Sequence, residues 1–342
     1  MANGTCHAWI QKYIIGKNIT LDFLNELHVK RNIGGITMLT IFSVIGVIGN
    51  AHVLYVYFRY FKYSNYRIYV LFLGILDVIN CGFAAPLVVF YLFYPLNYPS
   101  HSFCKIFRTI IYFMAIASTL LLVSIAIERF RKIRYPLKER LSATAVKGLC
   151  IGSLVGAAVL SWPAPIIWGL GTVETGIPGF QGKRCFTEDR FQNYNTNYQG
   201  IYNACLILFY FIVSATLMVM YIYIGIKIHT QYERDSSRRE SLQSGTFNCK
   251  ESIKSNKNNT RKSTITLCVV TFTYVLSALP HHMLSFFIFL IPDFDCSLSL
   301  IGSMLYYTFV WSYFFNSVVN PFIYGIRDRK FRLAVKNIYK RT

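Results

Sequence analysis

Seven long apolar stretches, each bounded by polar or turn-rich sequence, organise this chain. They cover roughly residues 33–59, 66–93, 102–130, 147–169, 199–228, 262–291 and 299–325. A helix needs about 20 mostly apolar residues to cross a bilayer, and every stretch reaches that length. The pattern predicts an all-α integral membrane protein, with a bundle of seven transmembrane helices over residues 33–325. Residues 1–32 precede this bundle and residues 326–342 follow it.

The positive charges predict how the bundle lies in the membrane. Lysine and arginine gather in the first, third and fifth loops and in the C-terminal segment, whereas loops 94–101 and 292–298 contain neither. Basic residues are in excess in cytoplasmic loops, so the N-terminus is expected outside the cell. Two glycosylation sequons, at Asn3 and Asn18, fit this orientation. The Lys30-Arg31 pair just before the first stretch argues against this orientation. More basic residues lie in the segments predicted to be cytoplasmic, so the orientation is kept.

Composition excludes several other classes of protein. Of the 342 residues, 54% are hydrophobic and only 15% are charged, compared with about 25% charged in soluble domains. The net charge of +20 lies in loops rather than on a soluble module, so nucleic-acid binding is not expected. Serine, histidine and aspartate are scattered over different predicted helices, with no setting for a nucleophile, so no enzymatic activity and no organic cofactor are expected.

A few polar side chains stand inside the predicted membrane spans. They are Asp77 in the second stretch, Ser118 in the third, and Asn316, Ser317 and Asn320 in the seventh. Pro280 and Pro321 interrupt the last two stretches, and each frees a backbone carbonyl. Oxygen atoms grouped beside such a kink suit water and a small hard cation. Hydrogen bonding between helices is the alternative, and the residues alone leave both readings open.

The third stretch ends in an adjacent acid and base, Glu128-Arg129, followed by Phe130. A charged side chain at membrane depth costs about 2.5–3.5 kcal/mol on insertion scales, so such a pair marks either a functional position or the start of a polar loop. Other motifs occur at matching places on the other stretches. In chain order they include Gly49-Asn50, Asp77, Cys104, Tyr135-Pro136-Leu137, Trp162, Cys185, Pro280 and Asn320-Pro321-Phe322-Ile323-Tyr324.

Together these motifs resemble the rhodopsin-like (class A) G-protein-coupled receptors, over roughly residues 33–340. The resemblance implies coupling to a heterotrimeric G protein through Glu128, Arg129, Phe130, Pro136, Tyr221, Asn320, Pro321 and Tyr324. In that family, the tyrosines matching Tyr221 and Tyr324 meet near the arginine in active receptors. Asp77, Ser118, Asn316, Ser317 and Asn320 match the family's allosteric sodium pocket. Residues 326–342 would form an amphipathic helix on the inner leaflet.

The resemblance also implies disulfide bonds on the outer side. Cys104 and Cys185 would tie the third span to the second outer loop. Cys6 and Cys296 are both outside by the predicted topology, so a second bridge is possible, with two free thiols as the alternative.

Three departures from the family pattern affect the connection between the two ends of the bundle. Ala278 stands where the sixth span usually has tryptophan, Val213 replaces the usual proline of the fifth span, and Thr260 stands where many members have an acid. We therefore expect a weakly restrained resting state with some basal signalling.

Single residues narrow the ligand class within this resemblance. Ile111 stands where amine receptors have aspartate, and Phe314 where opsins have the retinal-binding lysine, so neither ligand is expected. The sequence Leu279-Pro280-His281-His282 resembles galanin-type and allatostatin-type peptide receptors. The predicted ligand-binding residues are Arg108, Tyr112, Tyr202, His281, His282, Tyr306, Tyr307 and Trp311.

A neuropeptide-like extracellular ligand is therefore expected for a plasma-membrane receptor, with a heterotrimeric G protein and membrane lipids as further partners. A lipid or small acidic ligand held by Arg108 is the alternative. A transporter or channel is a remote alternative function, because Asp77 is the single acid near mid-membrane depth.

Overall fold

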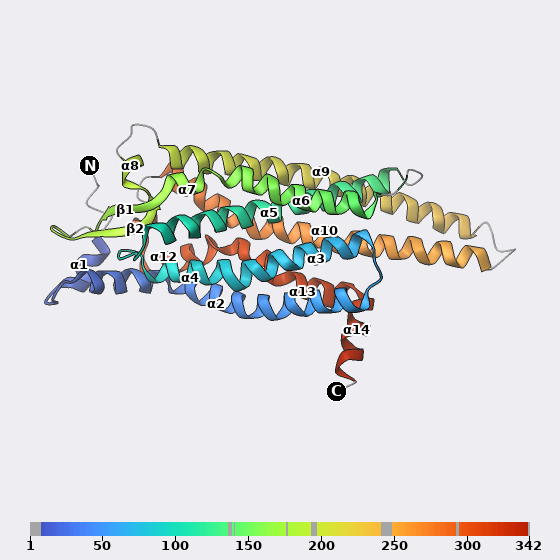
Figure 1. Ribbon diagram of the computed structural model, residues 1–342, viewed down its shortest axis with the longest axis horizontal. Helices are drawn as coiled ribbons and strands as arrows, with labels where there is room; N and C mark the ends of the chain where they lie inside the picture. The colour runs from blue at the N-terminus through green and yellow to red at the C-terminus, as the bar shows by residue number, and fades with distance from the viewer. Residues whose placement is uncertain are drawn as a thin grey trace.

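The computed structural model describes residues 8–135, 139, 141–175, 177–192, 197–240, 248–291 and 294–340. In this part of the chain, long helices lie side by side in one elongated bundle (Figure 1). The predicted positions Asn3, Cys6 and Pro136 lie outside the described residues, as does the side chain of Cys296. The expected all-α membrane architecture is confirmed.

The helices and the two short strands follow one another along the chain. The helices are α1 (Ala8–Ile14), α2 (Leu21–Tyr60), α3 (Asn65–Ile79), α4 (Ala85–Phe93), α5 (His101–Arg134), α6 (Ala143–Ser161), α7 (Ala164–Ile167), α8 (Asp189–Gln192), α9 (Tyr198–Glu240), α10 (Asn248–Leu290), α11 (Phe294–Ser297), α12 (Leu300–Phe309), α13 (Phe315–Arg327) and α14 (Arg329–Tyr339). A π-helical turn, η1 (Asn80–Ala84), and a 3₁₀ turn, η2 (Ser312–Phe314), complete the helical elements. The strands are β1 (Trp168–Glu174) and β2 (Gln181–Thr187).

Hydroxyl side chains fix where several of the long helices begin. Five helices start with a serine or threonine cap whose oxygen accepts a hydrogen bond from a backbone N–H three residues later: Thr20, Ser64, Ser100, Ser142 and Ser299. Each such cap stabilises a helix start by about 1 kcal/mol. Thr20 caps α2, so this helix begins at Leu21 rather than near residue 33. Its first turns therefore precede the apolar stretch.

Six helices in the described residues are long and apolar enough to cross a membrane. The seventh apolar stretch is divided into α12, η2 and α13, so no single helix covers it. A side chain and a backbone carbonyl of α10 hold this break. A ring nitrogen of His281, Nδ1, lies 2.5 Å from the carbonyl oxygen of Val310, and the Ser312 hydroxyl donates to the Ser277 carbonyl (2.7 Å).

Two other stretches also differ from the expected single helices. The fourth stretch leaves the helix at Ser161, passes through a turn at Trp162-Pro163, and enters strand β1 at Trp168. The prolines at 163 and 165 explain this boundary, because proline cannot continue the helical hydrogen-bond ladder. In the second stretch, η1 widens the helix just before Pro86.

Strands β1 and β2 form an antiparallel hairpin, with Trp168 opposite Thr187 and Glu174 opposite Gln181. Figure 1 shows this hairpin at the same end of the bundle as α1, with α14 at the opposite end. The segment after α4 joins the hairpin edge, since the Lys183 N–H donates to the Leu96 carbonyl at 2.7 Å. The predicted second outer loop therefore contains an ordered two-stranded sheet at one end of the bundle.

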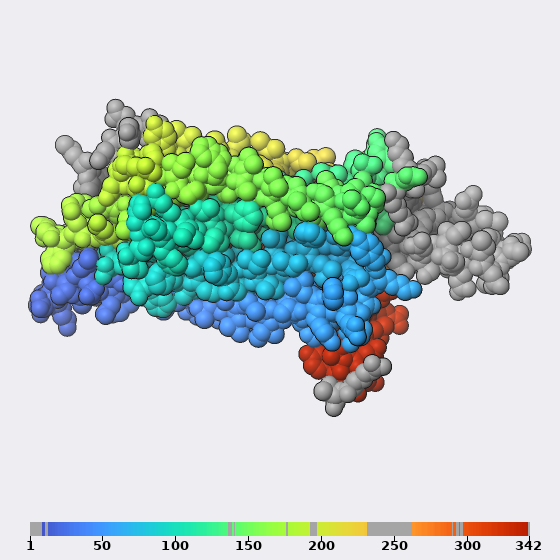
Figure 2. Space-filling model, viewed as in Figure 1, coloured from blue at the N-terminus to red at the C-terminus, as the bar shows by residue number. Residues whose placement is uncertain are grey.

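The interior is packed with aromatic and aliphatic side chains, and the outside of the helices is apolar as well. One large cluster joins α2, α3, α5, α6, α10 and α13, and a second lies nearer the hairpin. Exposed apolar residues such as Val44, Val219 and Ile226 cover the bundle's flanks, as expected where helices face lipid. Figure 2 shows α14 projecting from the body at the C-terminal end.

Helix α14 is amphipathic, as expected, but part of its apolar face packs on protein. Phe331 is buried and its ring stacks against Tyr57 of α2, with 5.8 Å between centroids. The Tyr339 ring stacks on His52, also of α2, at 5.9 Å. Asp328 caps this helix by accepting from the N–H groups of Lys330 and Phe331.

Candidate functional site

Glu128 and Arg129 form a buried ion pair near the end of α5 that lies away from the hairpin. Arg129 Nε lies 2.9 Å from Glu128 Oε2, and the side chains are only 1% and 5% exposed. In the described part of the chain, the two terminal nitrogens of Arg129 have no hydrogen-bond partner. The guanidinium lies 5.8 Å from the centre of the Tyr66 ring. A buried cation with free donors is costly, and it is ready to bind an incoming acceptor.

The residues around this pair come from several helices. Phe130 packs on Tyr223 of α9, with ring centroids 5.1 Å apart. Tyr221 shares a hydrogen bond with Thr271 of α10, at 3.0 Å between the oxygens. Tyr324, buried on α13, packs instead against Tyr57 at 5.6 Å. The two tyrosines expected to meet in an active receptor thus have different neighbours in this structure.

A buried polar cluster lies between α2, α3 and α13. The amide of Asn320 donates to Asp77 Oδ2 at 2.7 Å. The amide of Asn80 donates to the Ser317 hydroxyl at 2.9 Å, and that of Asn50 donates to the Ser317 carbonyl at 2.7 Å. These bonds join the three elements, as expected of hydrogen bonding between helices.

Several oxygen atoms of the predicted sodium residues are left over in this arrangement. Asp77, Ser118, Asn316, Ser317 and Asn320 are all buried. In the described residues, Asp77 Oδ1, Ser118 Oγ, Asn316 Oδ1 and Asn320 Oδ1 have no hydrogen-bond partner. Hard cations take oxygen ligands of these kinds, so the residues present fit a small cation such as sodium.

Gly49 and Pro321 explain why two of the sequence motifs occur together. A Cβ atom added at Gly49 would lie 2.9 Å from Cγ of Pro321. The missing side chain therefore lets α2 approach the proline of α13, and the neighbouring Asn50 reaches the Ser317 carbonyl. The Pro321 bend and the polar cluster are thus held against the same helix.

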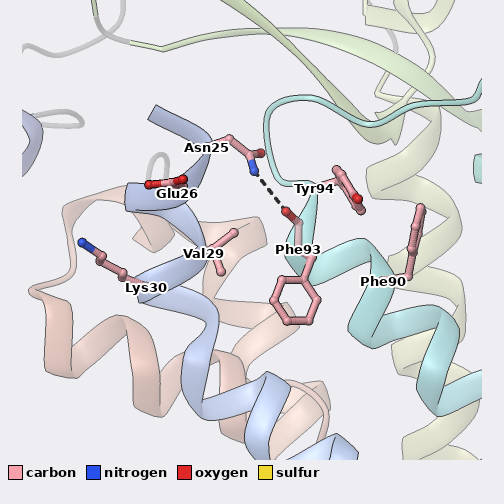
Figure 3. A pocket seen from close by; sticks show the side chains of 7 residues that line it. All are labelled: Asn25, Glu26, Val29, Lys30, Phe90, Phe93 and Tyr94. Atoms are coloured by element: carbon pink, nitrogen blue, oxygen red, sulfur yellow. Dashed lines mark hydrogen bonds between the residues drawn. The ribbon is translucent and has the colours of Figure 1, made fainter. Parts of the chain in front are cut away.

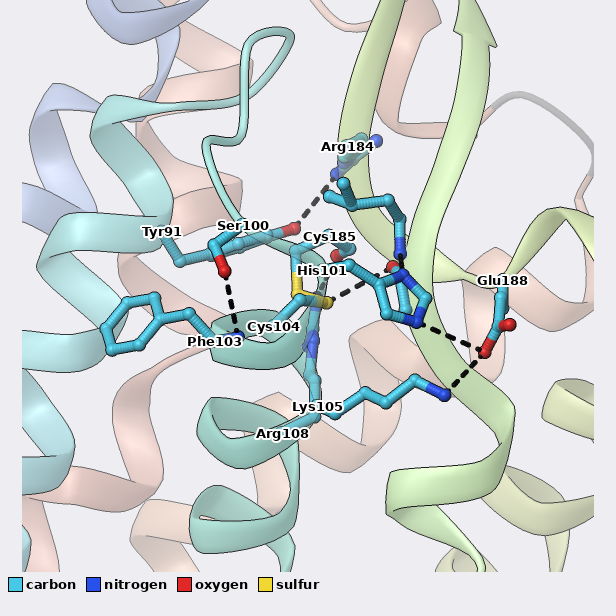
Figure 4. The surroundings of a disulfide bond; sticks show 12 residues. Tyr91, Ser100, His101, Phe103, Cys104, Lys105, Arg108, Arg184, Cys185 and Glu188 are labelled. Atoms are coloured by element: carbon cyan, nitrogen blue, oxygen red, sulfur yellow. Dashed lines mark hydrogen bonds and ion pairs between the residues drawn. A yellow bond between two sulfur atoms is a disulfide. The ribbon is translucent and has the colours of Figure 1, made fainter.

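The predicted bridge between Cys104 and Cys185 is confirmed, with their Cα atoms 5.5 Å apart (Figure 4). It joins the first turn of α5 to strand β2. An ion-pair cluster reinforces the junction, because Glu188 lies 2.8 Å from Lys105 Nζ and 3.1 Å from Arg190 Nε. The hairpin is therefore tied to α5 both covalently and electrostatically.

Arg108, one turn below the disulfide, is covered by the hairpin. Its Nη2 donates to the Cys185 carbonyl at 2.8 Å, and its guanidinium lies 4.4 Å from the Trp168 ring centre and 4.6 Å from that of Tyr91. The predicted ligand residue thus has a backbone acceptor and two aromatic faces as partners. An aromatic cage of this kind stabilises a cation without a carboxylate.

The other predicted ligand residues divide into two groups. Tyr112 and Tyr202 pack together beneath the hairpin, with rings 5.3 Å apart, and Tyr112 donates to Asn203 at 3.0 Å. The second group lies where α10 meets α12 and η2. It comprises His281, His282, Tyr306, Tyr307 and Trp311. The rings of Tyr306 and Tyr307 are 5.0 Å apart, and Trp311 is buried 6.3 Å from the Tyr91 ring.

The two histidines face different neighbours, as expected of adjacent residues on a helix. His281 contacts the carbonyl of Val310 and packs edge-on against Tyr313 at 4.9 Å. His282 stacks on Tyr210 of α9, with ring centroids 3.9 Å apart. His281 therefore holds the break after α12, whereas His282 joins α10 to α9.

Two further connections between helices were not predicted from the sequence. The hydroxyls of Thr119 and Tyr274 lie 2.6 Å apart and link α5 to α10. At the far end, the Tyr57 hydroxyl donates to Asp328 Oδ2 at 2.9 Å and lies 3.1 Å from that of Tyr66. The available signal was a hydroxyl side chain inside an otherwise apolar stretch, which does not identify its partner.

Comparison with known proteins places this geometry in a family. Residues 49–324 match the family described as 7 transmembrane receptor (rhodopsin family). Neuromedin-U receptor 2 of Mus musculus is 25% identical over 279 residues, which cover 78% of this chain and 65% of that receptor. Substance-P receptors of Meriones unguiculatus and Homo sapiens are 26% and 25% identical over 273 residues, which cover 77% of this chain and 62% of each receptor. The chain thus spans slightly less than two thirds of the length of these curated relatives.

The family match takes in the buried Glu128-Arg129 pair, the disulfide and the polar cluster on α3 and α13. It covers well over half of the chain. The chain therefore belongs to the rhodopsin family of 7 transmembrane receptors.

Proposed function

We propose that this chain is a plasma-membrane receptor that binds a peptide outside the cell and activates a heterotrimeric G protein inside it. The observation that carries the proposal is the buried Glu128-Arg129 pair at the end of α5 away from the hairpin, whose arginine has free donors among the residues that the structure describes. The basic loops favour a cytoplasmic location for this end. The N-terminus and the hairpin would then lie outside.

The peptide ligand is supported by the relatives and by the outer end of the bundle. The relatives are named as receptors for neuromedin U and substance P. The hairpin forms an ordered rim at this end of the bundle, on which a peptide could lie. Below it, the aromatic residues Tyr112, Tyr202 and Tyr307 offer large contact areas for peptide side chains.

The G-protein step would follow from movement of α10 away from α5. In the structure, the Thr119–Tyr274 hydrogen bond and the Tyr221–Thr271 bond join α10 to its neighbours. Breaking these contacts would open a cleft beside Arg129. The C-terminal helix of the G protein would dock there as an amphipathic helix in a groove.

A sodium ion would favour the closed arrangement by occupying the polar cluster. Asp77, Ser118, Asn316, Ser317 and Asn320 would hold it, since in the described part of the chain four of these residues have oxygens without a hydrogen-bond partner. The cation would supply positive charge opposite the buried carboxylate of Asp77.

The alternative, a lipid or small acid bound by Arg108, is less well supported. The guanidinium of Arg108 already donates to the Cys185 carbonyl and lies against Trp168. An acidic ligand would have to displace these contacts.

A peptide-library screen in cells tests the proposal and separates it from the alternative. The chain would be expressed with a promiscuous G-protein reporter and exposed to tissue-derived peptide pools. We expect at least one pool to activate the reporter and to lose its activity after protease digestion. A response that survives digestion would point to a lipid or small acid instead.

A further inference from the structure

Helix α2 is bonded to its neighbours at both of its ends. At the hairpin end, the side-chain amide of Asn25 donates to the Phe93 carbonyl at 3.0 Å, and Figure 3 shows this bond between α2 and the end of α4. The buried amide of Asn32 donates to the Leu92 carbonyl at 2.8 Å. At the opposite end of α2, Tyr57 is fully buried and contacts several other elements. This tyrosine therefore projects from a helix whose position is set by bonds further along it.

Four aromatic rings surround Tyr57. The centroid of its ring lies 4.1 Å from that of Phe61, 5.6 Å from that of Tyr324, 5.8 Å from that of Phe331 and 5.9 Å from that of Tyr66. These rings belong to the end of α2 and to α13, α14 and α3. Close packing holds buried side chains in defined rotamers, so the Tyr57 hydroxyl has a defined position among these helices.

The Tyr57 hydroxyl connects a carboxylate to a second tyrosine. It donates to Asp328 Oδ2 at 2.9 Å, and its oxygen lies 3.1 Å from that of the Tyr66 hydroxyl. A hydroxyl group has one hydrogen, and the hydrogen of Tyr57 is directed at Asp328. Tyr66 must therefore donate to the oxygen of Tyr57. The three side chains form a chain in which each hydroxyl donates in the direction of Asp328.

The ring of Tyr66 connects this chain to Arg129. The guanidinium carbon of Arg129 lies 5.8 Å from the centre of that ring. Among the described residues, Glu128 is the one carboxylate paired with Arg129, and it lies at Nε. A cation within about 6 Å of an aromatic ring is attracted to the π electrons of its face. Donation by the Tyr66 hydroxyl polarises the phenol toward negative charge, which strengthens this attraction.

We propose that the Tyr66 ring restrains Arg129 in the resting receptor, and that Asp328 positions Tyr66 for this role through Tyr57. The proposal rests on the proposed function, in which Arg129 is the G-protein contact. A docking G protein has to draw the guanidinium away from the ring, so the cation–π attraction opposes coupling. Because Asp328 also caps α14, the start of that helix and the availability of Arg129 are linked.

Ligand-free nucleotide exchange on a heterotrimeric G protein tests the restraint, with the full-length receptor in lipid nanodiscs. Tyr66→Leu removes the ring and should raise the basal exchange rate at least about twofold, because the cation–π attraction is lost. Tyr66→Phe keeps the ring and its packing, and should raise the rate by less. Tyr63→Leu is the matched control, since the Tyr63 ring is exposed and lies near Lys147 instead of Arg129. It should behave as the wild type.

Asp328→Asn tests the positioning role. If the asparagine oxygen caps α14, the amide nitrogen faces Tyr57 and cannot accept its hydrogen. Basal exchange should therefore rise in Asp328→Asn, but the same substitution should add nothing in the Tyr66→Leu background, where no ring is left to position. Amide hydrogen exchange over residues 329–339 checks that α14 stays folded. An equal rise in both backgrounds would show that Asp328 acts independently of Tyr66 and would overturn its positioning role.

The contact between Tyr66 and Arg129 can also be measured without a G protein. In receptor whose arginines carry a heavy nitrogen isotope, the Nε–H resonance of Arg129 is identified by its absence in Arg129→Gln. It should shift in Tyr66→Leu and stay in place in Tyr63→Leu. An unchanged resonance, or an unchanged basal rate in Tyr66→Leu beside a wild type that couples, would overturn the proposal. Where the leucine variant fails to fold, Tyr66→Phe decides by the same two readouts. A shifted resonance without exchange by any variant, the wild type included, would count against the proposed function alone.

Discussion

Several candidate functional residues of this protein are buried polar side chains. Glu128 and Arg129 are adjacent in sequence, so their side chains leave the helix about 100° apart, yet their charged groups meet at 2.9 Å. The sequence located this pair because charge is rare in an apolar stretch. It did not predict that the two would bond to each other and leave the terminal nitrogens of Arg129 unpartnered in the described residues.

The residues of the predicted sodium cluster were also recognisable from the sequence, as polar positions within apolar stretches. The individual bonds were not, because many pairings of amides, hydroxyls and one carboxylate are compatible with the same spacing. With Asn320 paired to Asp77 and Asn80 paired to Ser317, Asp77 Oδ1 has no hydrogen-bond partner in the described residues. We therefore expect Asp77 to be the critical residue of the cluster.

Replacing Asp77 with asparagine keeps the shape of the side chain and removes its charge. Agonist affinity of the wild type should change on replacing potassium with sodium at constant ionic strength. Couplings between two sites are typically about 1–3 kcal/mol, which corresponds to about fivefold or more in affinity. Asp77→Asn should abolish this difference in radioligand binding. A sodium dependence that persists in the variant would show that the ion, if bound, lies elsewhere.

At the scale of helices, hydropathy gave the number and approximate limits of the apolar stretches. It did not give the breaks within them, because hydropathy measures side-chain composition and not the backbone hydrogen-bond ladder. The division of the seventh stretch depends on His281 and Ser277 of another helix. The early start of α2 depends on one threonine cap, at a polar position that a hydropathy window ignores.

Helix α14 shows how a single residue can hold an element in place. Asp328 caps the helix through Oδ1 and receives the Tyr57 hydroxyl on Oδ2. The same tyrosine contacts Tyr66, whose ring lies under Arg129. This chain of contacts connects the start of α14 to the candidate G-protein site.

We expect Asp328→Ala to destabilise α14, because it removes both the cap and the acceptor for Tyr57. Loss of an N-cap costs about 0.5–2 kcal/mol, so amide hydrogen exchange over residues 329–339 should become about twofold to thirtyfold faster. Asp328→Asn is the matched control, since asparagine caps about as well as aspartate. Equal exchange in the wild type and in Asp328→Ala would contradict this role.

At the scale of the whole molecule, the structure separates two well-defined ends. The hairpin end is fixed by the Cys104–Cys185 bond and the Glu188 ion pairs, and the other end by the Glu128–Arg129 pair. Sequence motifs predicted the disulfide and located Glu128 and Arg129, because cysteines and charges within apolar stretches leave clear signals, whereas the Glu188 ion pairs were not predicted. The connection between them was less predictable. In this protein the hydroxyls of Thr119 and Tyr274 share a hydrogen bond. Tyr274 lies four residues before Ala278, which stands where the family usually has tryptophan.

If a peptide bound at the hairpin end drives nucleotide exchange through Arg129, the purified receptor in lipid nanodiscs should show peptide-stimulated exchange on a heterotrimeric G protein. Arg129→Gln leaves Glu128 buried without its partner, at a cost of about 3–5 kcal/mol. The double variant Glu128→Gln/Arg129→Gln removes both charges and is the better test, with Arg131→Gln, an exposed arginine two residues on, as control.

Loss of a charge-assisted contact of about 1.5–3 kcal/mol should reduce the stimulated exchange rate about tenfold or more in the double variant. Peptide binding should persist in that variant, and Arg131→Gln should behave as the wild type. Stimulated exchange at the wild-type rate in a correctly folded double variant would contradict the account.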